Sequence, residues 1–269
     1  MEYAKSECVI YVVGGDGTLT ITLPALIGTK NKLGIIPAGS GNDTYRTIKN
    51  MPTGETLIDV GKINDTYFIN VACTGIDAEI GNNMDKLRNT IIPTSQLYNA
   101  SIVYTFVKFK HKLMRLRTNI KNIEAKYTIL SICNGSYYGG GFKIAPKSRL
   151  EDGLLDIYYA EEMPKLKMIP LILKLKKGNH EGKRRVHKFR TNHIELELDE
   201  EITFNVDGEK LTDKKRRILY EVIKKDAIAY HIEVIDIDTI DKINIYQASK
   251  LGMKLCLEKL KIKPLWKLI

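Results

Sequence analysis

The chain has 269 residues, of which 43% are hydrophobic and 28% are charged, and a formal net charge of +10. This composition is that of a globular protein with enough material for one large domain or two ordinary ones. No apolar run approaches the roughly 20 residues of a membrane-spanning helix, and the first residues lack the apolar core of a signal peptide. We therefore expect a cytoplasmic protein whose positive charge favours an anionic partner.

The residues that most often bind metals or nucleic acids form no pattern for either role. Four cysteines stand singly inside apolar stretches, with no Cys-x-x-Cys spacing, and the five histidines are not grouped. Basic residues cluster at 108–117, 174–190 and 214–217, but few aromatic residues that could stack on bases lie among them. The sequence therefore favours a membrane surface or a nucleotide over nucleic acid, although any single cluster is more often an ordinary solvated face.

The first predicted element is a buried strand, Val9–Val13, and Gly14-Gly15-Asp16-Gly17-Thr18 follows it directly. In open α/β sheets, ligands bind at the carboxyl ends of the strands. The glycines allow a sharp turn and bring backbone N–H groups close to an anion, while Asp16 is placed to hold a cation against it. The junction predicts a site for phosphate and a divalent metal.

A helix at Leu19–Ile27 and a strand at Leu33–Pro37 complete a predicted strand-loop-helix-strand unit of the doubly wound kind. Pro24 and several β-branched residues weaken the helix, so we expect it to start later than the glycine loop implies. A second glycine-rich turn, Pro37–Asp43, follows the second strand. Two such loops at neighbouring strand ends are expected to converge on one ligand.

From Leu57 the pattern changes to many short strands separated by turn signals, which predicts an antiparallel β-sandwich domain. Two helices are expected inside it, at Gln96–Arg117 and Lys165–Lys177. The tail from Ile240 has a basic amphipathic pattern, which more often packs on its own domain than on a membrane. The predicted strands are Leu57–Val60, Tyr67–Cys73, Tyr127–Cys133, Leu154–Tyr159, His193–Leu198, Ile202–Val206 and Ile218–Val222.

Four segments, taken in order, resemble the diacylglycerol kinase catalytic-domain superfamily, in particular the soluble bacterial lipid kinases. NAD kinases share the first glycine loop but follow it with a different second loop and lack the Val-Asp-Gly-Glu ending. The segments are Gly14–Thr18, Pro37–Asp43, Tyr138–Phe142 leading to Glu151–Asp156, and Asn205–Glu209.

The resemblance implies an NAD kinase/diacylglycerol kinase-like fold, with an α/β nucleotide-binding domain at 1–55 and an antiparallel β-sandwich lipid-substrate domain at 56–222. It also implies that residues 223–269 pack back on the first domain. Family members open with a further strand and helices, whereas thirteen residues precede Gly14 here. We therefore expect an N-terminally truncated α/β domain that lacks its first strands.

The resemblance also implies ATP and Mg²⁺ as cofactors and assigns roles to single residues. Asp207 resembles the general base that takes the proton from a lipid hydroxyl, with Glu209 nearby, and Asp16 would organise the catalytic magnesium. Ser40 would offer its hydroxyl to the nucleotide. The implied nucleotide-binding residues are Gly14, Gly15, Asp16, Gly17, Thr18, Gly39, Ser40, Gly41, Asn42 and Asp43.

A second, structural magnesium site is implied at Asp152, with the backbone carbonyls of Arg149 and Leu154 as further ligands. Alternatives stay open for each motif. Asp152-Gly153 and Asp207-Gly208 are also ordinary hairpin turn signals, and Asn42-Asp43 is also a plain helix N-cap pattern.

Three functions are compatible with these motifs. The first is an ATP-dependent lipid kinase, with conversion of diacylglycerol to phosphatidic acid as the leading reaction. The second is a catalytically deficient fragment that serves as a lipid- or membrane-binding module, and the third is an NAD kinase. The expected partners of the kinase are a membrane lipid, an anionic membrane surface bound peripherally, and a second copy of the chain in a homodimer.

Overall fold

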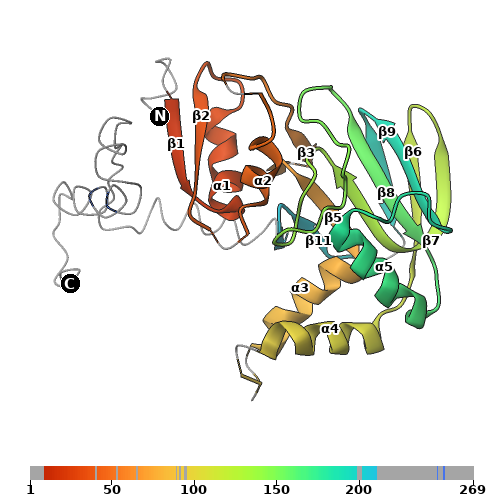
Figure 1. Ribbon diagram of the computed structural model, residues 1–269. Coiled ribbons are helices and arrows are strands. Elements are labelled where there is room, and N and C mark those ends of the chain that lie inside the picture. Colours follow the sequence, from red (N-terminus) through yellow and green to blue (C-terminus); the bar gives the residue numbers. More distant parts are fainter. Residues whose placement is uncertain are drawn as a thin grey trace.

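The computed structural model describes residues 9–210, apart from Ser40, Thr53, Asp65, Asn89, Ile91, Thr94, Ser95 and 199–201, together with Gln247 and Leu251. The predicted strand Ile218–Val222 and, except for those two residues, the predicted C-terminal segment 223–269 lie outside this range. The described chain has an α/β part and a β-sandwich part, which lie side by side (Figure 1). The predicted domain boundaries themselves stay predictions.

The α/β part consists of a parallel pair of strands and two helices. Strand β1 (Val9–Gly14) runs parallel to β2 (Lys32–Pro37), with Val9 opposite Lys32 and Gly14 opposite Pro37. Helix α1 (Asp16–Leu26) connects the two strands, and the short helix α2 (Asp43–Ile48) follows the second glycine turn. The predicted strand-loop-helix-strand unit is therefore present.

Helix α1 begins at Asp16, directly after the first glycines, so the expectation of a later start is wrong. Pro24 lies within the helix and removes one backbone hydrogen bond, but the helix continues past it to Leu26. Leu19 and Leu23 are buried with Leu26, and this packing on the domain outweighs the weak helix propensity of the segment.

Antiparallel strands form the second part, as the sequence predicts. The long strand β7 lies at its centre: its first half pairs with β6, its second half with β5, and its other edge with β8. A register shift between Tyr127 and Ile129 bends β7 and lets one strand serve both layers. The strands are β3 (Gly61–Ile63), β4 (Thr66–Phe68), β5 (Val71–Gly75), β6 (Lys112–Thr118), β7 (Asn122–Cys133), β8 (Leu155–Glu161), β9 (Val186–Thr191), β10 (Ile194–Leu198), β11 (Phe204–Val206) and β12 (Glu209–Lys210).

Three helices flank the sandwich: α3 (Ile76–Leu87), α4 (Leu97–Lys108) and α5 (Lys165–Lys177). The helix predicted at Gln96–Arg117 is wrong in its second half, which forms β6 instead. The segment Leu57–Val60 is not a regular strand, and α3 was not predicted. In the described part of the chain, no helix is both long and apolar enough to cross a membrane.

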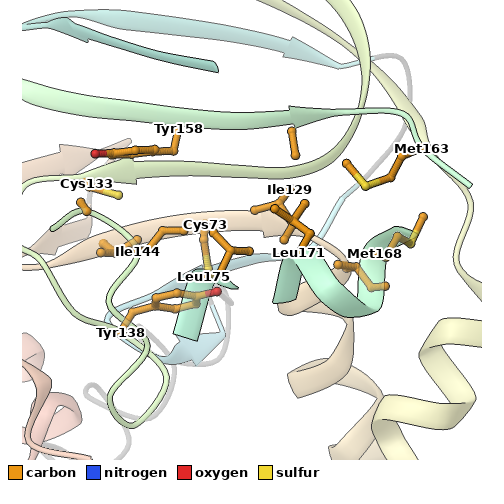
Figure 2. Packing of buried hydrophobic residues seen from close by; sticks show 14 of the residues in the cluster. Cys73, Ile129, Cys133, Tyr138, Ile144, Tyr158, Met163, Met168, Leu171 and Leu175 are labelled. Carbon is orange, nitrogen blue, oxygen red and sulfur yellow. The ribbon is translucent and has the colours of Figure 1, made fainter. Parts of the chain in front are cut away.

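The buried side chains form three clusters. One fills the sandwich interior around Leu116, Leu130 and Ile157. The second lies between the sheet and α5, where Figure 2 shows Leu171 and Leu175 beside Ile129 and Cys73 of the strands. The third joins α1 to the sandwich through Leu23, Ile69 and Leu150, so the two parts share buried contacts.

Candidate active site

The two glycine loops approach each other backbone to backbone, as expected for loops that converge on one ligand. A Cβ atom on Gly39 would lie 2.4 Å from the Cα of Gly15, so only glycine fits there. Asn42 holds the second loop: its side chain accepts a hydrogen bond from the N–H of Gly39 at 2.9 Å and donates one to the carbonyl of Gly39 at 2.6 Å. Asn42 stands at the N-cap position of α2, but its side chain bonds the glycine loop instead of capping the helix.

The start of α1 offers backbone donors beside these loops. The N-cap residue of α1 is Gly15, and no side chain caps the helix. The first N–H groups of a helix have no partner within the helix, and together with the helix dipole they favour an anion. The N–H groups of Asp16, Gly17 and Thr18 are therefore suited to bind phosphate.

Asp16 connects the two loops through its carboxylate. One oxygen accepts the N–H of Asp43 at 2.9 Å, and the other accepts the N–H of Thr44 at 2.8 Å. Asp16 therefore caps the N-terminus of α2, although it is 27 residues from Asp43 in the sequence. This cap fixes the orientation of α2 relative to α1.

Asp43 carries the connection on to the sandwich part. Its Oδ1 lies 2.9 Å from the guanidinium of Arg46, and its Oδ2 accepts the N–H of Gly140 at 2.7 Å. Burial raises the pKa of Asp43, and the nearby charge of Asp16 raises it further. The loop Tyr138–Phe142, which was picked out from the sequence, therefore faces the second glycine loop.

Asp207 lies at the tip of the hairpin between β11 and β12, with a positive φ of 47°. Its carboxylate accepts three backbone N–H groups, from Ile69 at 2.8 Å and from Asn70 and Val71 at 2.9 Å each. Burial raises the pKa of Asp207 to about 6, and the charge of Asp16 also raises it. The two predicted carboxylates are thus close enough to interact.

Asn70 is a functional candidate that the sequence reasoning missed. Its side chain accepts a hydrogen bond from Thr47 at 2.9 Å and donates one to Thr44 at 2.7 Å, both across the boundary between the two parts. Its backbone N–H bonds Asp207, so one residue orients both α2 and the hairpin. The sequence offers no local signal for this role, because the partners of Asn70 lie in distant segments.

Asp77, at the start of α3, was also missed. Burial raises its pKa to about 6. The hydroxyl of Tyr138 donates to it at 2.9 Å, which places a fourth acidic side chain behind the loop that contacts Asp43. A carboxylate two residues after the apolar segment of β5 was the signal in the sequence.

The turn at 149–154 holds Asp152 through two contacts. Its carboxylate accepts the N–H of Leu154 at 3.1 Å and forms an ion pair with Arg190. The guanidinium of Arg190 is thus the positive charge beside Asp152. The magnesium site predicted at Asp152, with the carbonyls of Arg149 and Leu154 as ligands, stays a prediction. Ser40 and the side chain of Glu209 lie outside the described residues, so their roles stay predictions too.

Oxygen ligands suitable for magnesium are present at the loops rather than as a preformed cage. Within the described residues, no group of three or more His, Cys, Asp and Glu side chains is arranged to hold a metal. Magnesium in phosphoryl-transfer sites usually takes one or two carboxylates plus phosphate oxygens and water. Asp16, with its free lone pairs beside the phosphate-binding loop, fits that pattern.

A parallel strand-helix-strand unit with two converging glycine loops, facing a carboxylate from an antiparallel sandwich, defines a two-domain phosphotransferase. Comparison with known proteins agrees with this class. Residues 2–71 match the diacylglycerol kinase catalytic domain, and residues 70–223 match the YegS C-terminal NAD kinase beta sandwich-like domain.

The chain belongs to the diacylglycerol kinase and YegS-like lipid kinase family, and it is a phosphotransferase enzyme. It is 30% identical over 213 residues to a diacylglycerol kinase of Mycobacterium tuberculosis, a match that covers 72% of this chain and 68% of the relative. It is 25% identical over 222 residues to the diacylglycerol kinase of Bacillus subtilis, which covers 74% and 70% of the two chains.

The fold is also found in solved structures. A crystal structure from Bacillus anthracis str. Sterne, assigned to the diacylglycerol kinases, superposes with a TM-score of 0.61 at 24% identity. The match covers 77% of this chain and 72% of that chain. The two-domain architecture expected from the sequence is therefore confirmed.

Proposed function

We propose that this protein transfers the γ-phosphate of ATP to the hydroxyl of a membrane lipid, with diacylglycerol as substrate and phosphatidic acid as product. The observation that carries the proposal is the position of Asp207. Three backbone N–H groups fix this carboxylate, and its pKa responds to Asp16 on the glycine loop. A base fixed opposite a phosphate-binding loop is what phosphoryl transfer to an alcohol requires.

The proposed reaction uses the groups on the two sides of the cleft. Backbone N–H groups at the start of α1 bind phosphate oxygens and align the γ-phosphate. Asp207 accepts the proton of the lipid hydroxyl as the hydroxyl oxygen forms its bond to the γ-phosphorus. The bond from that phosphorus to the β-phosphate oxygen breaks, and ADP leaves. Bound Mg²⁺, held beside Asp16, would neutralise charge on the phosphates.

The test is transfer of labelled phosphate from ATP to diacylglycerol in mixed micelles, followed as labelled phosphatidic acid. Asp207→Asn keeps the shape of the side chain but cannot take the proton, and we expect kcat to fall by roughly 10² to 10⁴. Because the pKa of Asp207 is about 6, kcat/KM of the unchanged protein should fall about tenfold per pH unit below that value.

A matched control uses Asp156, another buried carboxylate, which contacts Ser148 and Lys188 inside the sandwich. Asp156→Asn should lower the melting temperature but leave kcat within a few fold. If Asp207→Asn and the unchanged protein transfer phosphate at the same rate, the proposed role of Asp207 is wrong. Absence of transfer to any lipid, together with no binding of magnesium-ATP in calorimetric titration, would support the binding-module alternative instead.

A further inference from the structure

Helix α5 has two apolar faces rather than one. Met168, Leu171 and Leu175 are buried against the sheet. Leu166, Ile169 and Leu173 follow the same i, i+3, i+7 spacing on the opposite side of the helix. They are 81%, 48% and 61% exposed. An ordinary surface helix carries polar residues on that side, so the outer apolar stripe is not explained by the fold.

Helix α4 buries two polar residues and exposes several apolar ones. Ser101 and Thr105 are fully buried, and Thr105 accepts a hydrogen bond from Asn83 of α3 at 2.9 Å. Val103 and Val107 are instead 64% and 63% exposed, and Tyr104 beside them is 43% exposed. The helix buries these two hydroxyls and leaves Val103, Tyr104 and Val107 exposed, while Phe106 packs against the core.

The two outer faces lie at the same end of the molecule. Lys165, the first residue of α5, donates a hydrogen bond from its ammonium to the carbonyl of Val107 near the end of α4. Figure 1 shows α3, α4 and α5 grouped beside the sandwich, away from β1 and β2. We call the exposed residues Val103, Tyr104, Val107, Leu166, Ile169 and Leu173 the α4–α5 apolar face.

The charged residues on the two helices themselves are all basic. Helix α5 contains five lysines and no acidic residue, and α4 contains one lysine and no acidic residue. By helical position, Lys167 and Lys174 border the stripe of α5 on one side and Lys176 borders it on the other. Lysines beside an apolar stripe can extend their ammonium groups to phosphate headgroups while the stripe enters the lipid.

We propose that the α4–α5 apolar face is the surface by which this protein docks on an anionic lipid bilayer. The proposal deepens the proposed function, because a lipid kinase must reach a substrate that stays in the membrane. Charge decides between the two main occupants. A second copy of the face would set lysines against lysines, whereas an anionic bilayer attracts each of them by about 1 kcal/mol.

The docked face is connected to the catalytic cleft by α3. This helix carries Asp77 in its first turn, behind the loop that contacts Asp43, and further along Asn83 bonds Thr105 of α4. Its 12 residues span about 18 Å at 1.5 Å per residue. Docking through α4 and α5 therefore brings the cleft within about one helix length of the lipid.

The experiment is sedimentation with sucrose-loaded vesicles in the absence of ATP. The unchanged protein should sediment with vesicles of phosphatidylglycerol and phosphatidylcholine, less with phosphatidylcholine alone, and less as salt is raised. The triple variant Leu166→Ser/Ile169→Ser/Leu173→Ser should bind anionic vesicles at least tenfold more weakly. The matched control Leu57→Ser/Ile120→Ser changes two exposed apolar residues elsewhere and should bind like the unchanged protein.

Charge is tested separately. Lys167→Glu/Lys174→Glu should weaken binding to anionic vesicles, whereas Lys30→Glu, at an exposed position after α1, should not. Equal vesicle binding by the triple variant and the unchanged protein would overturn the proposal, as would failure of the unchanged protein to bind either vesicle. A dimer that the triple variant converts to monomer, with vesicle binding retained, would identify the face as a contact between copies and would also overturn it.

Two further readouts separate this proposal from its competitors. The triple variant should keep the melting temperature of the unchanged protein, and a clear fall would show that the stripe is buried within the protein, which contradicts docking. With a short-chain diacylglycerol dispersed in water, the triple variant should retain full activity and lose it only on vesicles. If no variant phosphorylates the dispersed lipid, the proposed function fails, while the binding measurements still decide the docking surface.

Discussion

Single backbone contacts at the glycines decide whether the two phosphate-binding loops can meet. Gly15 and Gly39 follow different strands, and a Cβ atom on Gly39 would lie only 2.4 Å from the Cα of Gly15. The same positions could be named from the sequence, because glycines cluster after two predicted strands. The distance between the loops could not be predicted from the sequence, since it depends on the parallel pairing of β1 with β2.

Replacing Gly39 tests this contact. In Gly39→Ala the new Cβ would lie 2.4 Å from the Cα of Gly15, so the loops must separate. We expect ATP affinity to fall at least tenfold, measured by calorimetric titration. Gly28→Ala is the matched control: Gly28 has a positive φ of 77° but open space around it. That variant should lose roughly 1 kcal/mol of stability and bind ATP normally, and weakened binding there would point to general loosening instead.

The partly buried acid Asp77 should make the stability of the protein depend on pH. Burial raises its pKa from the ordinary value of 3.8 to about 6. The folded state then holds the proton more tightly than the unfolded state, so the free energy of unfolding falls as pH rises from about 4 to 6. The share of Asp77 is at most about 3 kcal/mol, because each pKa unit corresponds to about 1.4 kcal/mol.

Urea unfolding between pH 4 and pH 8 measures this slope. Asp77→Asn should flatten it, leaving the fall that Asp207 contributes through its own raised pKa. Tyr138→Phe should act in the opposite direction, because the hydrogen bond from Tyr138 lowers the pKa of Asp77. The same slope in all three proteins would show that Asp77 does not titrate in this range.

At the scale of elements, the sequence predicted the helices and strands that local patterns determine. The predictions failed for elements that depend on packing against the rest of the chain. Apolar and charged residues alternate in the segment Lys112–Thr118, which is a strand pattern. Met114 and Leu116 are buried, and an arginine follows each of them. The sequence nevertheless predicts one helix through this segment, because Gln96–Lys108 is a strong helical run and no glycine or proline separates that run from Lys112. In helix α1, packing overrides the local pattern. Pro24 weakens the helix, but the burial of Leu23 and Leu26 stabilises it.

In the candidate site, too, the sequence predicted the residues of local motifs and missed a residue whose role depends on distant contacts. The motifs placed Asp16 and Asp207 in one site by resemblance, and the structure brings them within electrostatic reach. Asn70 was not predicted because nothing within its own segment reveals its partners. Its hydrogen bonds reach Thr44, 26 residues away, and Asp207, 137 residues away. A residue that acts by joining distant segments has no local signature in a single sequence.

At the scale of the whole molecule, the cleft depends on the contacts that hold the two parts together. Thr44, on α2, accepts a hydrogen bond from the buried amide of Asn70 at 2.7 Å, and Thr47 donates to the same amide. Gly140 of the sandwich part donates to Asp43. These bonds set α2, and with it the second glycine loop, against Asp207.

Thr44→Val removes one of these contacts at nearly constant volume and leaves the amide nitrogen of Asn70 without its partner. An unsatisfied buried donor costs roughly 1 to 3 kcal/mol. Since that cost falls on the contact between the two parts, we expect calorimetry to show the single unfolding transition broadening or splitting into two. kcat should fall several fold while ATP affinity changes little, because Thr44→Val keeps the backbone of both glycine loops and the N–H of residue 44 that bonds Asp16. A single, sharp transition at unchanged temperature would mean that other contacts, such as the Leu23–Ile69–Leu150 cluster, couple the two parts.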